Sequence, residues 1–99
     1  AYGLNRLYEA SVMRGDKLMH EIERAKKAEV LLREPLLVES FDQLESNFID
    51  AWQNTSVADT DNRERIYYLL SALKALRGHL TNVVENGKVA QLNLEQLKK

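Results

Sequence analysis

The sequence predicts an all-α protein, a helical hairpin with a long C-terminal helix that assembles through helix-to-helix packing. Apolar residues recur at alternating steps of three and four through the last third of the chain, the heptad spacing that keeps a stripe on one side of a helix. A second segment with similar spacing precedes it, and a short polar stretch joins the two. The stripe of the last helix, called the seam below, consists of Ile66, Leu69, Leu73, Leu76, Leu80, Val83, Gly87, Ala90, Leu94 and Leu97.

The last helix has a start signal near residue 61. Asp61 is followed three residues later by Glu64, a spacing typical of a capping box, and Thr60 is a competing N-cap. We therefore expect the helix to begin at about residue 61.

The end of this helix depends on Gly87. The glycine follows an asparagine, a common C-terminal signal, and it costs about 1 kcal/mol relative to alanine in a helix interior. The helix spans 61–86 or 61–98, and the unbroken phase of the seam favours a continuous or gently kinked helix. A glycine on the seam would then allow the close approach of another backbone.

The first third of the chain predicts a helix over 16–33. Asp16 can cap this helix, and its acidic residues come early while its basic residues come late, the order that suits the helix dipole. Residues 1–15 extend this helix, form a short separate one, or stay mobile until a partner covers them.

A middle helix is predicted over 36–53. Pro35 lacks an amide hydrogen, so it marks a sharp turn or the first turn of a new helix. The polar residues 54–61 have the composition of a connecting loop that ends in a helix cap, and a short loop makes its flanking helices antiparallel neighbours. The apolar residues of the middle helix step by four and three, so we expect a core helix that buries Leu37, Phe41, Leu44, Phe48 and Ala51.

Composition limits the classes of function. The 99 residues make one domain at most, 1–99, and a chain this short has a thin core, so we expect its helices to need partners. Fourteen Lys and Arg residues stand against 15 Asp and Glu residues, so any contact with nucleic acid must come from a local patch. No cysteine is present, and no apolar run has membrane-spanning length. We expect a cytoplasmic protein that binds no membrane.

No residue pattern indicates catalysis or metal binding. His20 and His79 each lack a nearby cysteine or second histidine, so a zinc site is not expected. No glycine-rich phosphate-binding motif is present. We expect a protein that is not an enzyme and has no catalytic residue, no cofactor, no metal and no small-molecule substrate.

Five basic residues of the last helix fall in one narrow sector beside the seam: Arg63, Lys74, Arg77, Lys88 and Lys99, of which the first four are the candidate contacts to nucleic acid. This basic stripe has two interpretations. It could follow a DNA phosphate backbone, or it could pair with acidic residues of the middle helix such as Glu39, Asp42 or Glu45.

Two further groups are candidates for binding. Trp52, Tyr67 and Tyr68 could stack on nucleic-acid bases, or they could fill the helix interface at the loop end. The seam offers more apolar width than one short helix covers, which predicts a homo-oligomer. The predicted oligomer interface consists of Leu69, Leu73, Leu76, Leu80 and Val83.

Residues 28–92 also resemble a family. The likeness lies in the leucine pair before Pro35, the FxxLExxFIxAW run from Phe41 to Trp52, the run SVADTDNRERIYYLLSALKALRGHL, and the closing GKVA. In these features the chain resembles short helical proteins of tailed double-stranded DNA bacteriophages and prophages, whose gene neighbourhoods serve genome packaging and head assembly. There, the small terminase subunit is a ring-forming, DNA-recognising adaptor for the packaging motor.

The resemblance implies a non-enzymatic oligomeric adaptor in the cytoplasm of an infected bacterial host. Its partners would be further copies of itself, double-stranded DNA and a packaging motor subunit. The chain lacks the helix-turn-helix that many small terminases carry at the N-terminus. The alternative is a helical assembly or regulatory protein that binds only protein partners.

Overall fold

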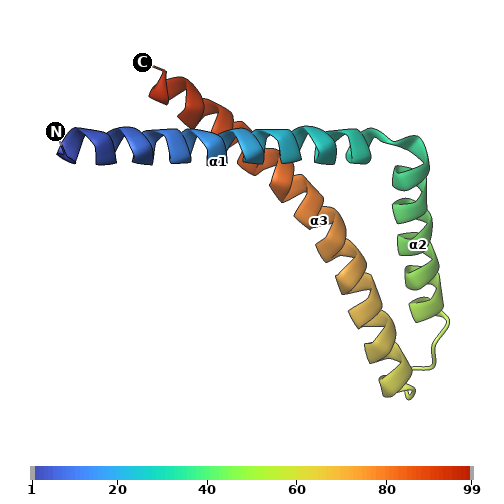
Figure 1. The fold of residues 1–99 in the computed structure, drawn as a ribbon. Helices are drawn as coiled ribbons and strands as arrows, with labels where there is room; N and C mark the ends of the chain where they lie inside the picture. Colours follow the sequence, from blue (N-terminus) through green and yellow to red (C-terminus); the bar gives the residue numbers. More distant parts are fainter. Residues whose placement is uncertain (1, 99) are drawn as a thin grey trace. The chain divides into compact units, whose positions relative to one another are not determined.

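The computed structural model describes the backbone of residues 2–98 and the side chains of residue 9 and residues 12–98. The described residues form three helices and no strand, which confirms the all-α prediction (Figure 1). The helices are α1 (Tyr2–Arg33), α2 (Pro35–Gln53) and α3 (Thr60–Leu97).

Helix α1 begins earlier than the predicted start at residue 16. Asp16 lies inside the helix and is not its cap. Gly15 does not have positive φ, and one glycine costs about 1 kcal/mol, which does not suffice to break a helix of good helix formers. Of the alternatives for residues 1–15, the structure thus shows extension of the same helix from residue 2 onward.

The junction between α1 and α2 is set by Pro35. Glu34 adopts an extended conformation as the N-cap of α2, and its carboxylate accepts a hydrogen bond from the Leu36 backbone N–H at 3.4 Å. Pro35 then occupies the first turn of α2, where its missing N–H has no intrahelical partner to lose.

Within the predicted domain 1–99, the chain divides into two compact units. The first, here the hairpin unit, is Leu31–Leu80. The second, here the crossing unit, combines Ala1–Val30 with Thr81–Lys99.

In the hairpin unit, α2 runs antiparallel to the first half of α3, as predicted (Figure 1). Among its described side chains only Phe41 and Ile66 are buried hydrophobic residues. The core of this unit is therefore very thin.

The loop between α2 and α3 supplies a helix cap that differs from the predicted one. The Asp59 carboxylate accepts a hydrogen bond from the Asn62 backbone N–H at 3.4 Å, and the Asp59 carbonyl accepts one from the Arg63 backbone N–H at 3.1 Å. Asp59 is therefore the N-cap, and Asp61 lies inside the first turn. The prediction of an Asp61 and Glu64 capping box was wrong, because the helix starts one residue earlier and places both inside it.

In the crossing unit, α1 packs against the C-terminal half of α3 through small residues (Figure 1). Gly87 is buried, and a Cβ added there would collide with the Ala25 Cβ and lie 3.4 Å from the Glu21 carbonyl oxygen. The prediction that Gly87 admits a second backbone is confirmed. Helix α3 also continues through Gly87 to Leu97, so the longer of the two predicted spans is correct.

Candidate protein-binding surface

The hairpin unit has two unlike sides, which follow from helical phase. At about 100° per residue, Leu44 falls about 60° to one side of the buried Phe41, whereas Glu45 and Asp42 fall about 40° and 100° to the other. The phase of α3 around Ile66 divides its residues in the same way. The charged side consists of Asp42, Glu45, Lys74 and Arg77, and the leucine side consists of Leu44, Leu69 and Leu76.

The charged side is paired across the hairpin. The Arg77 guanidinium donates to the Asp42 carboxylate at 2.8 Å, and the Lys74 ammonium lies 3.8 Å from the Glu45 carboxylate. Arg77 also lies over the Phe41 ring, 5.6 Å from its centroid. The interpretation of the basic stripe as a partner of acids on the middle helix is confirmed for Asp42 and Glu45.

Two more residues of the basic stripe, Arg63 and Lys88, also have partners within the chain, and Lys99 lies outside the described residues. The Arg63 guanidinium lies 4.0 Å from the centroid of the Trp52 ring and donates to the Thr55 hydroxyl at 3.0 Å. The Lys88 ammonium lies 3.2 Å from the carboxylate of Glu85, one turn earlier on α3. A phosphate would therefore have to compete with an existing contact at every predicted DNA-binding residue.

The leucine side is exposed. Leu44, Leu69 and Leu76 retain 43%, 47% and 54% of their accessible surface. Leu44 lies between Asp42 and Glu45 on α2, and Leu76 lies between Lys74 and Arg77 on α3. Because these flanking residues pair across the hairpin, Leu44 and Leu76 lie at the same level. An uncovered apolar band therefore runs along both helices of the hairpin.

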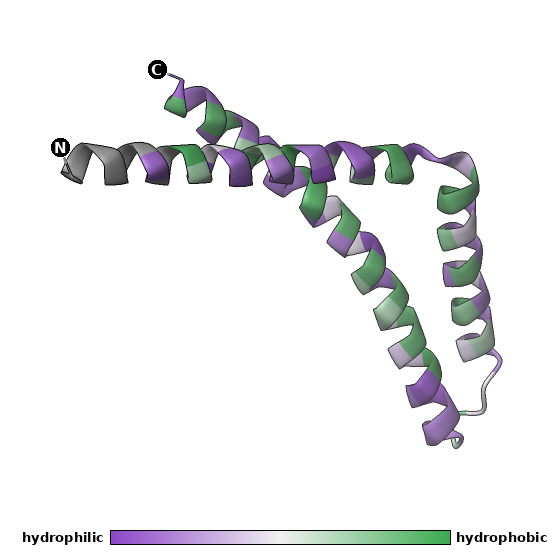
Figure 2. Cartoon of the chain, viewed as in Figure 1, coloured by the Kyte–Doolittle hydropathy of each residue, from purple (hydrophilic) through white to green (hydrophobic). Residues whose placement is uncertain are grey.

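The surroundings of this band are nearly uncharged. At the same phase lie Ser40, Asn47 and Ala51 on α2 and Ala72 on α3, and Arg65 near the loop is the charged residue there. Figure 2 shows the alternation of apolar and polar residues along the two helices. Apart from Arg65, the border of the band is uncharged and consists of short side chains, which permits close packing of another helix.

The predicted oligomer interface is only partly exposed. Leu69 and Leu76 are exposed, whereas Leu73, Leu80 and Val83 are half-buried within the chain. Leu44 was expected in the core of the hairpin, yet it belongs to the exposed band. The position of Leu44 at the edge of the apolar face of α2 could have predicted this exposure from the sequence.

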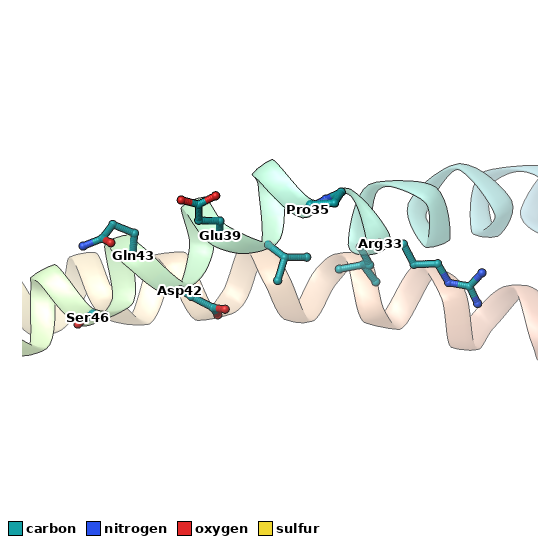
Figure 3. A pocket seen from close by; sticks show the side chains of 8 residues that line it. Arg33, Pro35, Glu39, Asp42, Gln43 and Ser46 are labelled. Carbon is teal, nitrogen blue, oxygen red and sulfur yellow. The ribbon is translucent and has the colours of Figure 1, made fainter.

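A broad groove lies at the junction between α1 and α2 (Figure 3). Its volume is about 620 Å³, and its lining mixes apolar and polar residues: Leu32, Arg33, Pro35, Val38, Glu39, Asp42, Gln43 and Ser46. In Figure 3 Glu39 and Gln43 point away from α3, whereas Asp42 lies on the α3 side, consistent with its ion pair to Arg77.

A smaller pocket lies between α2 and α3 near the loop. It has a volume of about 90 Å³ and is lined by Ile49, Trp52, Ile66, Tyr67 and Leu70. The Tyr67 and Tyr68 rings meet edge to face with centroids 6.1 Å apart. Two of the three aromatic residues singled out from the sequence, Trp52 and Tyr67, thus line a pocket that stays partly open, so they do not close the loop end completely.

Tyr68 is not part of the lining of this pocket, and it is exposed. Its hydroxyl donates a hydrogen bond to the Glu64 carboxylate at 2.9 Å. This bond, together with the negative charge of Glu64, raises the pKa of Tyr68 above its ordinary value.

Over the part of the chain that the structure describes, no group of three or more His, Cys, Asp or Glu side chains is placed to hold a metal ion. In the same residues, no helix has both the length and the apolar character needed to cross a bilayer. Comparison with protein-family models, with curated proteins and with solved structures found no match to the chain.

Proposed function

We propose that this chain is a helical assembly protein that forms a homo-oligomer through the leucine side of its hairpin. The observation that carries this proposal is the contrast between the two sides of the hairpin. The cations of the charged side are engaged within the chain, whereas the leucines of the other side are about half exposed.

The thin core of the hairpin supports the same proposal. With Phe41 and Ile66 as the buried hydrophobic residues among its described side chains, the unit has little internal packing to stabilise it. Covering the leucine side with a second copy would extend that core. A heptad-spaced helix face is suited to this, because its side chains interdigitate with those of a like helix.

The resemblance to tailed-phage proteins supplies the proposed context, which is genome packaging or head assembly in an infected bacterium. A small-terminase-like adaptor would contact DNA as well as the motor. The pairing of Lys74 and Arg77 with Glu45 and Asp42 favours a function in which the chain binds protein and does not bind DNA through the basic stripe.

Sedimentation equilibrium tests the proposal with two matched variants. Leu76→Asp places a charge on the leucine side, whereas Leu92→Asp makes the same change at a similarly exposed leucine of α3 outside it, since the two leucines retain 54% and 61% of their surface. Dimerisation would bury the surface of Leu76 that is still exposed in each copy. Losing this burial in the variant costs about 2–3 kcal/mol per dimer. That is more than a tenfold loss of affinity, before the cost of burying the new carboxylates.

The proposal predicts a wild-type oligomer that Leu76→Asp weakens and Leu92→Asp leaves intact. A wild-type monomer at high protein concentration would refute it, as would equal effects of the two variants. Adding duplex DNA at low salt separates the alternatives. Salt-sensitive binding that is lost on replacing Lys74 and Arg77 together would establish the adaptor function instead.

A further inference from the structure

The dipeptide Asn86-Gly87 has a chemical reactivity that helix α3 suppresses. The backbone nitrogen of a residue that follows an asparagine can attack the Cγ atom of the asparagine side chain. The attack is easiest when that residue is glycine, because glycine has no Cβ beside its nitrogen and a permissive backbone. The sequence contains one such dipeptide, at positions 86 and 87.

Helix α3 keeps the reacting atoms out of the geometry that the attack needs. Both residues lie in the interior of the helix, and Gly87 does not have positive φ. In an α-helix the N–H of Gly87 is directed at the carbonyl of Val83, four residues earlier, so its nitrogen is engaged. Ring closure also needs the ψ angle of Asn86 to leave the helical value of about −42°. The attack therefore requires α3 to open locally at these residues.

The crossing with α1 adds to this protection. Gly87 is buried, and a Cβ placed there would collide with the Ala25 Cβ and lie 3.4 Å from the Glu21 carbonyl oxygen. The backbone of α1 therefore lies directly against the peptide group that would have to move. Opening of α3 at Gly87 separates this contact, so the free energy of opening includes the packing lost at the crossing.

The side chain of Asn86, by contrast, is exposed to solvent. It lines a small cavity of about 70 Å³ together with Glu21, Arg24 and Val83. Water thus reaches the amide group in the folded chain. The backbone conformation, and not the access of water, limits the reaction.

We propose that Asn86 is a deamidation site whose reaction is controlled by the crossing of α1 and α3. While the crossing is closed, the site is unreactive. When α3 opens, the Gly87 nitrogen bonds to the Cγ atom of Asn86, and the side-chain nitrogen leaves as ammonia with the proton of the Gly87 N–H. The resulting succinimide ring then adds water at either of its carbonyls, which gives aspartate or isoaspartate. The reaction needs no oxidant, reductant or cofactor.

The two products differ in their effect on the fold. Isoaspartate routes the backbone through the former side chain and lengthens it by a methylene group, so the helical hydrogen bonds across this point cannot re-form. The rest of α3, which includes the buried Ala90, would lose its phase against α1. Aspartate keeps the backbone unchanged and places a carboxylate in the cavity that Glu21 and Arg24 line. Formation of isoaspartate therefore makes the opening of the crossing irreversible.

Deamidation of the intact chain can be followed at neutral pH by the mass increase that occurs when an amide becomes a carboxylate, with peptide mapping to locate it at residue 86. The native wild type is compared with the same chain in guanidinium chloride. We expect the native chain to react at least about tenfold more slowly, because opening of a helix interior is a minor state.

Two variants that gain the same side chain test the role of the crossing. Ala25→Leu forces a larger group into the contact with Gly87, whereas Ala75→Leu changes an exposed residue of α3. Ala25→Leu should react about 5- to 150-fold faster than wild type, up to the rate in guanidinium chloride, because overpacking favours the open state by about that factor. Ala75→Leu should react at the rate of wild type.

A further measurement uses neither of these variants, so it holds even if Ala25→Leu does not fold. The isoaspartate form of the wild type is separated by ion exchange and compared with Asn86→Asp, which has the same charge and an unaltered backbone. By circular dichroism, the isoaspartate form should contain less helix and should unfold at a lower temperature.

Equal rates for the native chain and the chain in guanidinium chloride would overturn the proposal, since α3 would then give no protection. Equal rates for folded Ala25→Leu and Ala75→Leu would exclude control by the crossing. An isoaspartate form as helical and as stable as Asn86→Asp would exclude the irreversible opening. None of these outcomes involves the leucine side, so failure here is distinguishable from failure of the proposed self-association.

Discussion

Gly87 and Gly78 provide a matched test of the helix crossing. Both lie in the interior of α3, so replacing either by alanine should gain the same helix propensity, about 1 kcal/mol. A Cβ at Gly78 meets nothing within 4 Å, whereas a Cβ at Gly87 collides with the Ala25 Cβ. The difference between the two variants therefore isolates the packing at the crossing.

The size of that difference follows from overpacking. Forcing an extra methyl group into a closely packed site costs about 1–3 kcal/mol. Gly78→Ala should therefore be stabilising, and Gly87→Ala should be about 1–3 kcal/mol less stable than Gly78→Ala. For a chain of this size 1 kcal/mol corresponds to a change in Tm of about 4–8 °C.

Thermal unfolding followed by circular dichroism measures both variants, at one protein concentration because self-association would shift Tm. Adding Ala25→Gly to Gly87→Ala should restore part of the loss, and the coupling between the two sites gives the contact directly. If Gly87→Ala stabilises the protein as much as Gly78→Ala, the close approach of α1 and α3 at Gly87 is refuted.

Three other predictions concern the hairpin. Arg77→Asp should destabilise the hairpin by about 1–2 kcal/mol, since an exposed ion pair contributes up to about 1 kcal/mol and two carboxylates then face each other. Adding Asp42→Arg should restore the lost stability, as measured by chemical denaturation. If it does not, the ion pair between the two positions is excluded. Asp59→Ala should cost about 1 kcal/mol of stability because the N-cap is lost, whereas Asp61→Ala should cost less. If Asp61→Ala lowers Tm more than Asp59→Ala does, Asp61 is the cap after all. Glu64→Gln should lower the pKa of Tyr68 toward its ordinary value in an NMR titration of that ring. Because the folded pKa is raised, this bond stabilises below the pKa of unfolded tyrosine and is lost as pH rises through the folded value, so an unchanged titration in Glu64→Gln would contradict it.

The periodicity of apolar residues predicted the helices well, because burial of one face is a local property of the sequence. The phase of the seam across Gly87 correctly indicated a continuous α3. The N-cap of α3 was missed because Asp59 and Asp61 are both good N-caps, and the choice between them depends on how the loop closes.

The candidate site was only partly predictable, because it depends on the register between helices. The pairing of Arg77 with Asp42 was among the partners expected from charge alone. The position of Arg63 over Trp52 was not, since it needs the length and conformation of the loop that separates them. Likewise, the exposure of Leu44 depends on how far α2 rotates about its axis against α3.

Single-cysteine cross-linking tests most directly whether the leucine sides of two copies meet. The chain has no cysteine, so Leu69→Cys and Leu76→Cys each introduce one thiol on the leucine side, and Leu92→Cys introduces one outside it. If the α3 helices of two copies pair in parallel, mild oxidation should produce covalent dimers in each of the Leu69→Cys and Leu76→Cys samples. If they pair antiparallel, covalent dimers should form chiefly when the two variants are mixed. Leu92→Cys should remain monomeric on a denaturing gel. Rapid cross-linking of Leu92→Cys alone, with none on the leucine side in any combination, would contradict self-association through that surface.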